Sequence, residues 1–324
     1  MICGKQKRNF QKVVDIVLFP MKNVINDDGT KIFPPVEPWY TYKIIIELKK
    51  ILPDFNNYLF IFYNHNGTTL PISRNFKHDK KILFWEAGEN KQQQFNKIKS
   101  DYLCIFTHYA KSHGKIHSFP LGYFKNELNS DVIEMSERFF NISFTGCLNR
   151  NRLSLASILS GKPKRYLISK LINQKKKTLD TINSIVKLDY NNDYFQFNED
   201  FNTGLNTERY LYFLKNSKII LCPRGWLNTE TFRMYEAMRY GCVVITEKLP
   251  NRDYYKNIPV IQVDNWKDGL KIARQLLQDK EKLAEMGKEN QEFYKNHFDP
   301  KVVAKNISLL IKRLGNKKKF SESC

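Results

Sequence analysis

The chain has 324 residues, 42% of them hydrophobic and 14% aromatic, which is enough for two globular domains. It carries 53 Lys and Arg against 33 Asp and Glu, a formal net charge of +20, and this excess indicates an anionic partner such as nucleic acid, an acidic membrane surface or a phosphorylated substrate. Six cysteines without a CxxC pair argue against a zinc site or a disulfide framework, and no stretch approaches the roughly 20 apolar residues of a membrane span. We therefore expect a cytoplasmic protein.

The first part of the chain, up to about Glu137, alternates short apolar runs with helical segments. A helix is predicted at Thr41–Leu52, and another segment, Asn90–Lys99, lies between two of the later strands. The predicted strands are Val13–Phe19, Tyr58–Tyr63, Lys81–Trp85, Tyr102–Thr107 and a short one in His117–Gly122. Because alternating strands and helices are typical of a parallel sheet, residues 1–138 are predicted to form one α/β domain.

The second part of the chain shows the same alternation and is predicted to form a second α/β domain at residues 139–300. Asn191–Thr207 is interpreted as a polar loop, and Val186–Asp189 as a candidate strand. The predicted strands are Phe140–Thr145, Ile219–Cys222, Val243–Ile245 and Val260–Val263, and the predicted helices Leu153–Leu159, Glu208–Asn216, Thr231–Tyr240, Trp266–Asp279 and Lys280–His297. A basic helix and tail follow at residues 301–324.

The stretch Lys218–Glu247 contains a strand, a Pro-Arg-Gly turn, a helix and a second strand, which together make a βαβ unit. Open α/β sheets place their ligands at the carboxyl ends of such strands. The loop and helix start carry Arg224, Gly225, Thr231, Arg233 and Glu236, with Thr231 as the predicted N-cap. Free backbone N–H groups, a positive helix end and arginines suit a diphosphate, and the carboxylate suits a ribose.

Chemistry alone leaves an alternative for the same helix. Arg233 and Glu236 are three residues apart, so they could form an ion pair on a solvated helix face, with Arg239 joining them. The spacing does not distinguish this surface pair from a nucleotide site.

The same residues resemble the nucleotide-sugar signature of exostosin-type glycosyltransferases. The likeness is carried by Leu221-Cys-Pro-Arg-Gly225, Thr231-x-Arg-x-x-Glu-Ala237 and Gly241-Cys-Val-Val244, and it extends to the Phe144-Thr-Gly146 strand with Arg150 and Arg152 beyond it. The sequence departs from the pattern at Thr231, where exostosins usually carry Ser, and at Val244, where Pro is frequent. Asn228 stands where retaining two-domain enzymes often carry a second Glu.

This resemblance implies a GT-B-like architecture, in which two Rossmann-like parallel-sheet domains face a cleft and a C-terminal helix crosses back to the first domain. It implies that Glu236 contacts the donor ribose and that Arg150, Arg152, Arg224 and Arg233 surround the donor phosphates. It also implies an inverting reaction that uses no metal and no cofactor other than the nucleotide-diphosphate sugar.

Transfer of a sugar to a hydroxyl group also needs a general base, which we expect from the first domain. Glu86 follows a predicted strand and precedes a glycine turn, so it is the first candidate, and His65 is the second. His108 also follows a strand. For each histidine the alternative is a structural or surface role, and for Glu86 it is a carboxylate at a helix start.

The leading hypothesis is a glycosyltransferase that uses a nucleotide-diphosphate sugar and a glycan or lipid-linked acceptor. The basic charge would suit a peripheral position on the inner, anionic face of a membrane. One alternative is a basic nucleic-acid-binding protein, although no nucleic-acid-binding motif is present. Another is a non-catalytic protein that binds sugar nucleotides.

Overall fold

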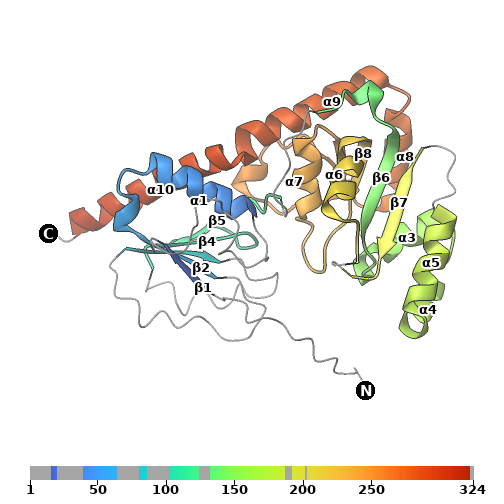
Figure 1. Ribbon diagram of the computed structural model, residues 1–324, viewed down its shortest axis with the longest axis horizontal. Helices are drawn as coiled ribbons and strands as arrows, with labels where there is room; N and C mark the ends of the chain where they lie inside the picture. The colour runs from blue at the N-terminus through green and yellow to red at the C-terminus, as the bar shows by residue number, and fades with distance from the viewer. Residues whose placement is uncertain are drawn as a thin grey trace. The chain divides into compact units, whose positions relative to one another are not determined.

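The computed structural model describes residues 16–19, 39–63, 80–85, 102–123, 132–186, 192–200 and 203–321 (Figure 1). The chain divides into two compact units. The first contains Met1–Glu37, Leu52–Ser118 and Leu310–Cys324, and the second contains Pro38–Ile51 and Phe119–Leu309. Each unit has its own five-stranded sheet, so the predicted α/β class with two Rossmann-like sheets is confirmed.

The sheet of the first unit has the strand order β1-β2-β3-β4-β5. Phenylalanines from three neighbouring strands, Phe60, Phe84 and Phe106, pack ring to ring in its core. The strands are β1 (Ile16–Phe19), β2 (Leu59–Tyr63), β3 (Lys81–Trp85), β4 (Cys104–Thr107) and β5 (Ile116–Ser118), and the 3-10 helix η1 (Phe55–Asn57) precedes β2.

One feature of this sheet differs from the prediction of a parallel sheet. β1 pairs antiparallel with β2, while β2 to β5 pair in parallel. An antiparallel edge strand on an otherwise parallel sheet is common, and a short apolar run carries no information about its direction. The predicted segment Asn90–Lys99 lies outside the described residues.

The sheet of the second unit is parallel throughout and has the order β10-β9-β8-β6-β7. Its strands are β6 (Phe140–Cys147), β7 (Tyr194–Asn198), β8 (Ser217–Cys222), β9 (Val243–Glu247) and β10 (Ile261–Val263). The chain starts in β6, moves to one neighbour, β7, and then to the other side through β8, β9 and β10. This is a doubly wound order, and its direction reverses between β6 and β8.

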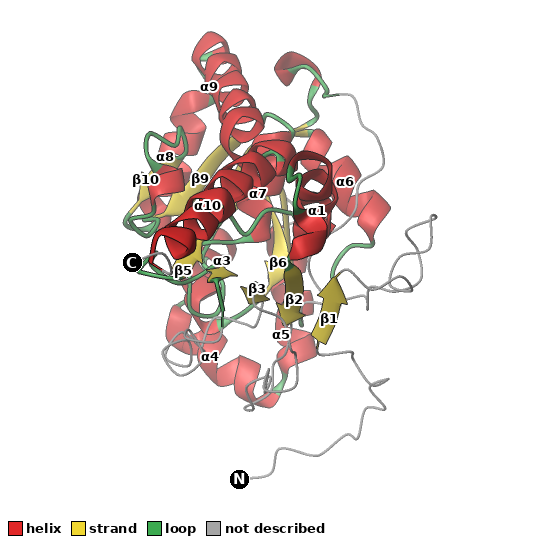
Figure 2. Cartoon of the chain, turned by 90° about the vertical axis from the view of Figure 1, so that its left-hand side faces the viewer, coloured by secondary structure: helices red, strands yellow, loops and turns green. Residues whose placement is uncertain are grey.

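Helices surround the strands of this unit (Figure 2). The described helices that belong to this unit are α1 (Trp39–Ile51), α3 (Leu153–Ser160), α4 (Lys164–Asn173), α5 (Lys175–Val186), α6 (Thr207–Lys215), α7 (Phe232–Arg239), α8 (Trp266–Leu276), α9 (Lys280–Phe293) and the first part of α10 (Pro300–Ser321). Shorter helical turns are η5 (Met135–Glu137), η6 (Arg150–Arg152), η7 (Asp253–Tyr255) and the π-helix η8 (Tyr294–Phe298). The predicted βαβ unit is therefore confirmed as β8, α7 and β9.

The two units of the structure do not meet at residue 138, where the boundary between the domains was expected. Helix α1 groups with the second unit, where the Tyr40 hydroxyl donates to the Phe298 carbonyl oxygen at 2.6 Å. Gly122 has a φ of +68°, and a Cβ there would lie 2.1 Å from the Tyr40 ring, so only glycine fits this contact. The last helix, α10, starts in the second unit and joins the first from Leu310 onward, as the predicted crossing helix requires.

The interpretation of Asn191–Thr207 as loop was wrong, because β7 lies within it. The alternating sequence of β7 places Phe195 and Phe197 in the core, and a short strand with polar neighbours gives a weak signal. Val186 ends α5, and the rest of the candidate strand Val186–Asp189 lies outside the described residues. Among the described helices, none is both long enough and apolar enough to cross a membrane.

Candidate functional site at the carboxyl edge of the second sheet

The strand order of the second unit places the candidate site where β6 and β8 end. In doubly wound sheets, ligands bind beyond the carboxyl ends of the strands at the point where the strand order reverses. β6 ends at Cys147 and continues into η6, which carries Arg150 and Arg152. β8 ends at Cys222 and continues into the loop before α7. Both predicted arginine-bearing segments therefore start from this edge.

Two guanidinium groups meet at this edge over one buried aromatic ring. The guanidinium carbon of Arg233 lies 4.7 Å from the centre of the Phe144 ring, and that of Arg152 lies 5.6 Å from it. Burial, and then repulsion from Arg233, lower the pKa of Arg152 to about 10, so Arg152 remains charged at neutral pH. Like charges held this close are costly unless an anion is bound beside them.

Backbone oxygens fix the direction of both arginines. Arg152 donates from Nη1 to the Cys147 carbonyl oxygen at 2.8 Å and from Nε to the Arg224 carbonyl oxygen at 3.2 Å. Arg233 donates from Nη2 to the Thr145 carbonyl oxygen. Gly146 permits this arrangement, because a Cβ there would lie 2.5 Å from Nη2 of Arg233 and 3.2 Å from Nη1 of Arg152.

Several polar groups at this edge are buried without a hydrogen-bond partner among the described residues. They include Nε and Nη1 of Arg233, Nε of Arg224, Oγ1 of Thr231 and Nδ2 of Asn149. A buried donor without a partner costs about 1–3 kcal/mol, so such groups are suited to binding a ligand. These groups are N–H or O–H donors, which suits an anion.

Side-chain amides hold the loops around the arginines in place, and their role was not predicted from the sequence. Asn149 caps η6, because its Oδ1 accepts from the backbone N–H groups of Asn151 and Arg152 at 3.0 and 3.1 Å. Asn151 donates from Nδ2 to the carbonyl oxygens of Gly225 and Trp226 at 2.8 and 2.7 Å. Asn151 thus connects the loop after β6 to the loop after β8.

Glu236 is held on α7 by a tyrosine from another helix. Its carboxylate is buried, with 6% of the residue exposed, and its Oε2 accepts from the Tyr210 hydroxyl at 2.7 Å. Burial, and then the charge of Glu236, raise the pKa of Tyr210 well above its ordinary value, so the hydroxyl stays protonated as a donor. The alternative of an Arg233–Glu236 ion pair on a solvated face is wrong for this helix, because Arg233 turns to Thr145 and Glu236 is buried.

The remaining predicted positions are placed as follows. Arg150 is exposed in η6, so only Arg152 of that pair lies at the buried edge. Thr231 occupies the N-cap position of α7, but its side chain makes no capping hydrogen bond. Arg224 donates from Nη2 to the Leu227 carbonyl oxygen, and the N–H of Gly225 closes the turn to Asn228 at 2.8 Å. The N–H of Gly225 is therefore already hydrogen-bonded within the loop.

The predicted base candidates, Glu86 and His65, lie outside the described residues and stay predictions. His108 is buried beside Tyr109. Within the described part of the chain, no group of His, Cys, Asp or Glu is placed to hold a metal ion. Asp193, in the Asn191-Asn192-Asp193 run, accepts hydrogen bonds from Arg274 and from the Ile142 N–H, so its role is structural.

Comparison with known proteins places the chain in a family. The family model described as the RXYLT1 C-terminal domain matches residues 123–313, more than half of the chain. No curated protein matches. This xylosyltransferase-related match supports a glycosyltransferase-type enzyme in general terms, and it leaves the donor and acceptor open.

Solved structures with low sequence identity also match. A glycosyltransferase from Rickettsia africae ESF-5 has 10% identity and a TM-score of 0.46, with 87% of this chain and 84% of that chain covered. A protein from Listeria monocytogenes described as a UDP-N-acetylglucosamine 2-epimerase has 12% identity and a TM-score of 0.45, with 86% and 80% covered. A sucrose-phosphate synthase from Thermosynechococcus elongatus has 10% identity and a TM-score of 0.42, with 76% of both chains covered. These likenesses are too weak to carry an argument about function.

Proposed function

Because the chain belongs to the RXYLT1 C-terminal domain family, we propose that it is a glycosyltransferase that takes its sugar from a nucleotide-diphosphate donor. The observation that carries this proposal is the pair of guanidinium groups, Arg152 and Arg233, over the Phe144 ring at the switch point of the sheet. Arg233 itself and the loops that lead to it carry buried donors without a partner among the described residues, and the carboxylate of Glu236 belongs to the same helix as Arg233.

Each of these groups has a role in the proposed reaction. Arg152 and Arg233 bind the diphosphate and stabilise the negative charge that develops on it as the bond to the sugar breaks. The free Thr231 hydroxyl and the N-terminus of α7 add neutral donors and a positive dipole end. Glu236 accepts hydrogen bonds from the ribose hydroxyls. With these cations in place, the proposed reaction requires no divalent ion.

The acceptor side of the proposal rests on the first domain. We propose a glycan or a lipid-linked glycan as acceptor, with inversion at the anomeric carbon, in a GT-B-like arrangement. Glu86 is the first candidate for the base that deprotonates the acceptor hydroxyl, and His65 is the second. These roles rest on position in the sequence and await mutation of each residue.

The donor site can be tested by thermal shift with UDP, GDP, CDP, ADP, CMP and inorganic pyrophosphate. A ligand that binds only the native state raises the melting temperature, and the shift grows with ligand concentration over Kd. One nucleoside diphosphate should stabilise the wild type. Arg233→Ala and Glu236→Ala should weaken its binding about 10- to 100-fold, since each removes a charge-assisted hydrogen bond.

The matched control is Arg209→Ala, which removes an exposed arginine from α6 and should leave the shift unchanged. Pyrophosphate binding should depend on Arg233 and not on Glu236. If no diphosphate stabilises the wild type, the proposed donor site is wrong. If a sugar nucleotide binds but is not turned over with any acceptor, the non-catalytic alternative replaces the enzymatic one.

A further inference from the structure

One long segment of the second unit carries positive charge without any acidic residue. Between Glu137 and Asp180 the sequence has no acidic residue, whereas ten Lys and Arg residues lie in that interval. Helix α9, by contrast, alternates its lysines with glutamates at positions 281, 285, 289 and 292. A uniform excess of lysine across the chain would not produce this difference.

Seven of these ten cations lie on or beside helices α4 and α5. We call residues 158–177, from the end of α3 through α4 to the start of α5, the basic hairpin. Among the α4 residues whose burial is described, Leu167 and Leu171 turn toward the core and the others are exposed. The cations, all exposed, are Lys162, Lys164, Arg165, Lys170, Lys175, Lys176 and Lys177.

Large apolar side chains are exposed among these cations. Ile168 is 45% exposed and Tyr166 is 41% exposed on α4, and Ile158 is 40% exposed at the end of α3. Ile168 lies three and four residues after Arg165 and Lys164, which places it on the same helix face as both. The Lys170 ammonium lies 6.0 Å from the centre of the Tyr166 ring. The simplest alternative, a solvated helix end, explains the lysines but not the apolar side chains.

We propose that the basic hairpin docks on a membrane surface that contains anionic phospholipids. Lys and Arg are attracted to the negative headgroups, while the Ile168 side chain, on the same helix face as Lys164 and Arg165, enters the boundary between headgroups and acyl chains. Nucleic acid fits this face less well, because isoleucine offers no stacking surface for bases and Tyr166 is its one exposed aromatic residue. The proposal is independent of the donor site and of the reaction.

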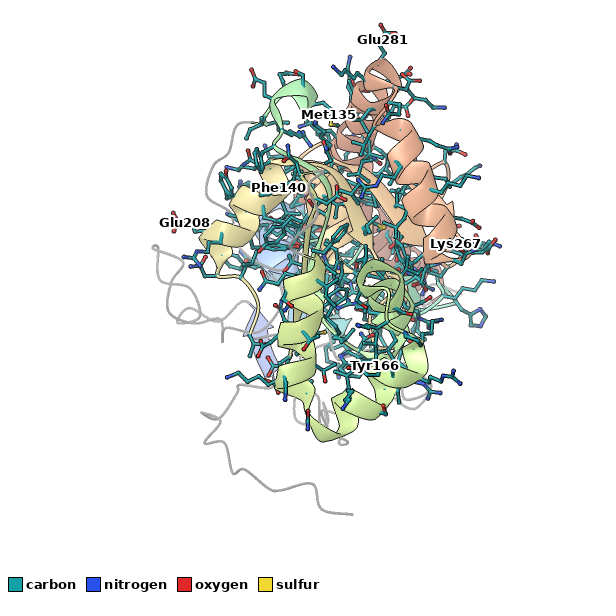
Figure 3. All side chains as sticks on the ribbon, turned by 90° about the vertical axis from the view of Figure 1, so that its right-hand side faces the viewer. Met135, Phe140, Tyr166, Glu208, Lys267 and Glu281 are labelled. Carbon is teal, nitrogen blue, oxygen red and sulfur yellow. The ribbon has the colours of Figure 1, made fainter. Side chains whose placement is uncertain are left out.

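Figure 3 shows Tyr166 on the basic hairpin, well separated from Lys267 on α8 and Glu281 on α9. This separation supplies a matched control within one unit. The test variant is Lys164→Glu, Arg165→Glu and Lys176→Glu combined, and the control is Lys267→Glu, Lys271→Glu and Lys282→Glu combined. Both triples change exposed residues and lower the net charge by the same amount.

The experiment is co-sedimentation of the full chain with vesicles of phosphatidylcholine alone or with about one third phosphatidylserine. The wild type should bind only the anionic vesicles. Each cation near such a surface contributes roughly fivefold to affinity, so the test triple should bind at least about 100-fold more weakly, and the control triple should lose far less. Tyr166→Ser with Ile168→Ser should weaken binding several-fold, and that loss should persist at high salt.

Three outcomes would overturn the proposal. The first is a wild type that does not bind anionic vesicles. The second is an equal loss in both triples, which would show that net charge alone attracts the vesicles. The third is unchanged vesicle binding by the Tyr166 and Ile168 variant, together with displacement of the wild type by single-stranded RNA, which would assign the face to nucleic acid. Circular dichroism melting of each variant confirms that it is folded.

Discussion

At the scale of single residues, the hydroxyl of Tyr210 is one group that holds the Glu236 carboxylate. Its hydrogen bond to Oε2 is 2.7 Å long and part-buried, and α6 supplies it from outside the βαβ unit. We expect Tyr210→Phe to weaken binding of the preferred nucleoside diphosphate about 5- to 10-fold, because a buried hydrogen bond contributes about 1 kcal/mol and Glu236 would lose one of the contacts that orient it. Isothermal titration calorimetry measures this change.

Pyrophosphate separates this positioning role from a general loss of structure. It has no ribose, so its affinity should be the same in Tyr210→Phe and in the wild type. Tyr212→Phe is the matched control, since Tyr212 belongs to the same helix and is largely exposed. Equal weakening of pyrophosphate and nucleoside diphosphate by Tyr210→Phe would contradict a role through Glu236.

At the scale of elements, the end of β6 sets the space in which the two guanidinium groups lie. Gly146→Ala would bring a Cβ to 2.5 Å from Nη2 of Arg233, and the flexible end of that side chain must move away. We expect about 10- to 100-fold weaker binding of the diphosphate, because a charge-assisted hydrogen bond is displaced, with little change in the melting temperature. Binding and melting are measured on the same preparation.

Gly269→Ala provides the control for this substitution. Gly269 lies in α8, where an added Cβ would meet ordinary contacts at 3.4 Å, so diphosphate affinity should not change. A Gly146→Ala variant that binds the diphosphate as tightly as the wild type would show that the Arg233 guanidinium is not a ligand in its present position.

The elements that were predicted correctly are those formed by a continuous run of residues with a clear pattern. The buried runs of β8 and β9 and the Gly-Cys break after α7 are continuous in the sequence, so the βαβ unit and its arginines were predicted. Tyr210 lies on the predicted helix Glu208–Asn216, but its contact with Glu236 was not predicted. Its bond to Glu236 joins residues 26 positions apart, and no spacing rule connects them. Asn151 was missed for the same reason, because its partners lie more than 70 residues away.

At the scale of the whole molecule, two of the helices do not belong where their position in the sequence suggests. α1 lies between the first two strands of the first unit in the sequence but groups with the second unit. α10 starts in the second unit and ends in the first. Amphipathic patterns predict that such helices are buried on one face, but they do not specify the sheet or helix that covers that face.

The division of α10 between the units leads to a prediction about stability. A chain that ends at Leu309 keeps Val303, Ala304 and Ile307, which are buried in the second unit, and loses Ile311, which is fully buried. Loss of one buried isoleucine costs about 1.5–3 kcal/mol, so the transition of the first unit should fall by roughly 5–10 °C. Differential scanning calorimetry with the preferred diphosphate identifies the second unit, because the ligand raises only the melting temperature of the unit that binds it.

The control is a chain that ends at Ser321. The melting temperature of the second unit and the affinity for the diphosphate should be the same in the two chains. If affinity falls together with stability, the donor site depends on the segment after Leu309, and the second unit does not hold it alone.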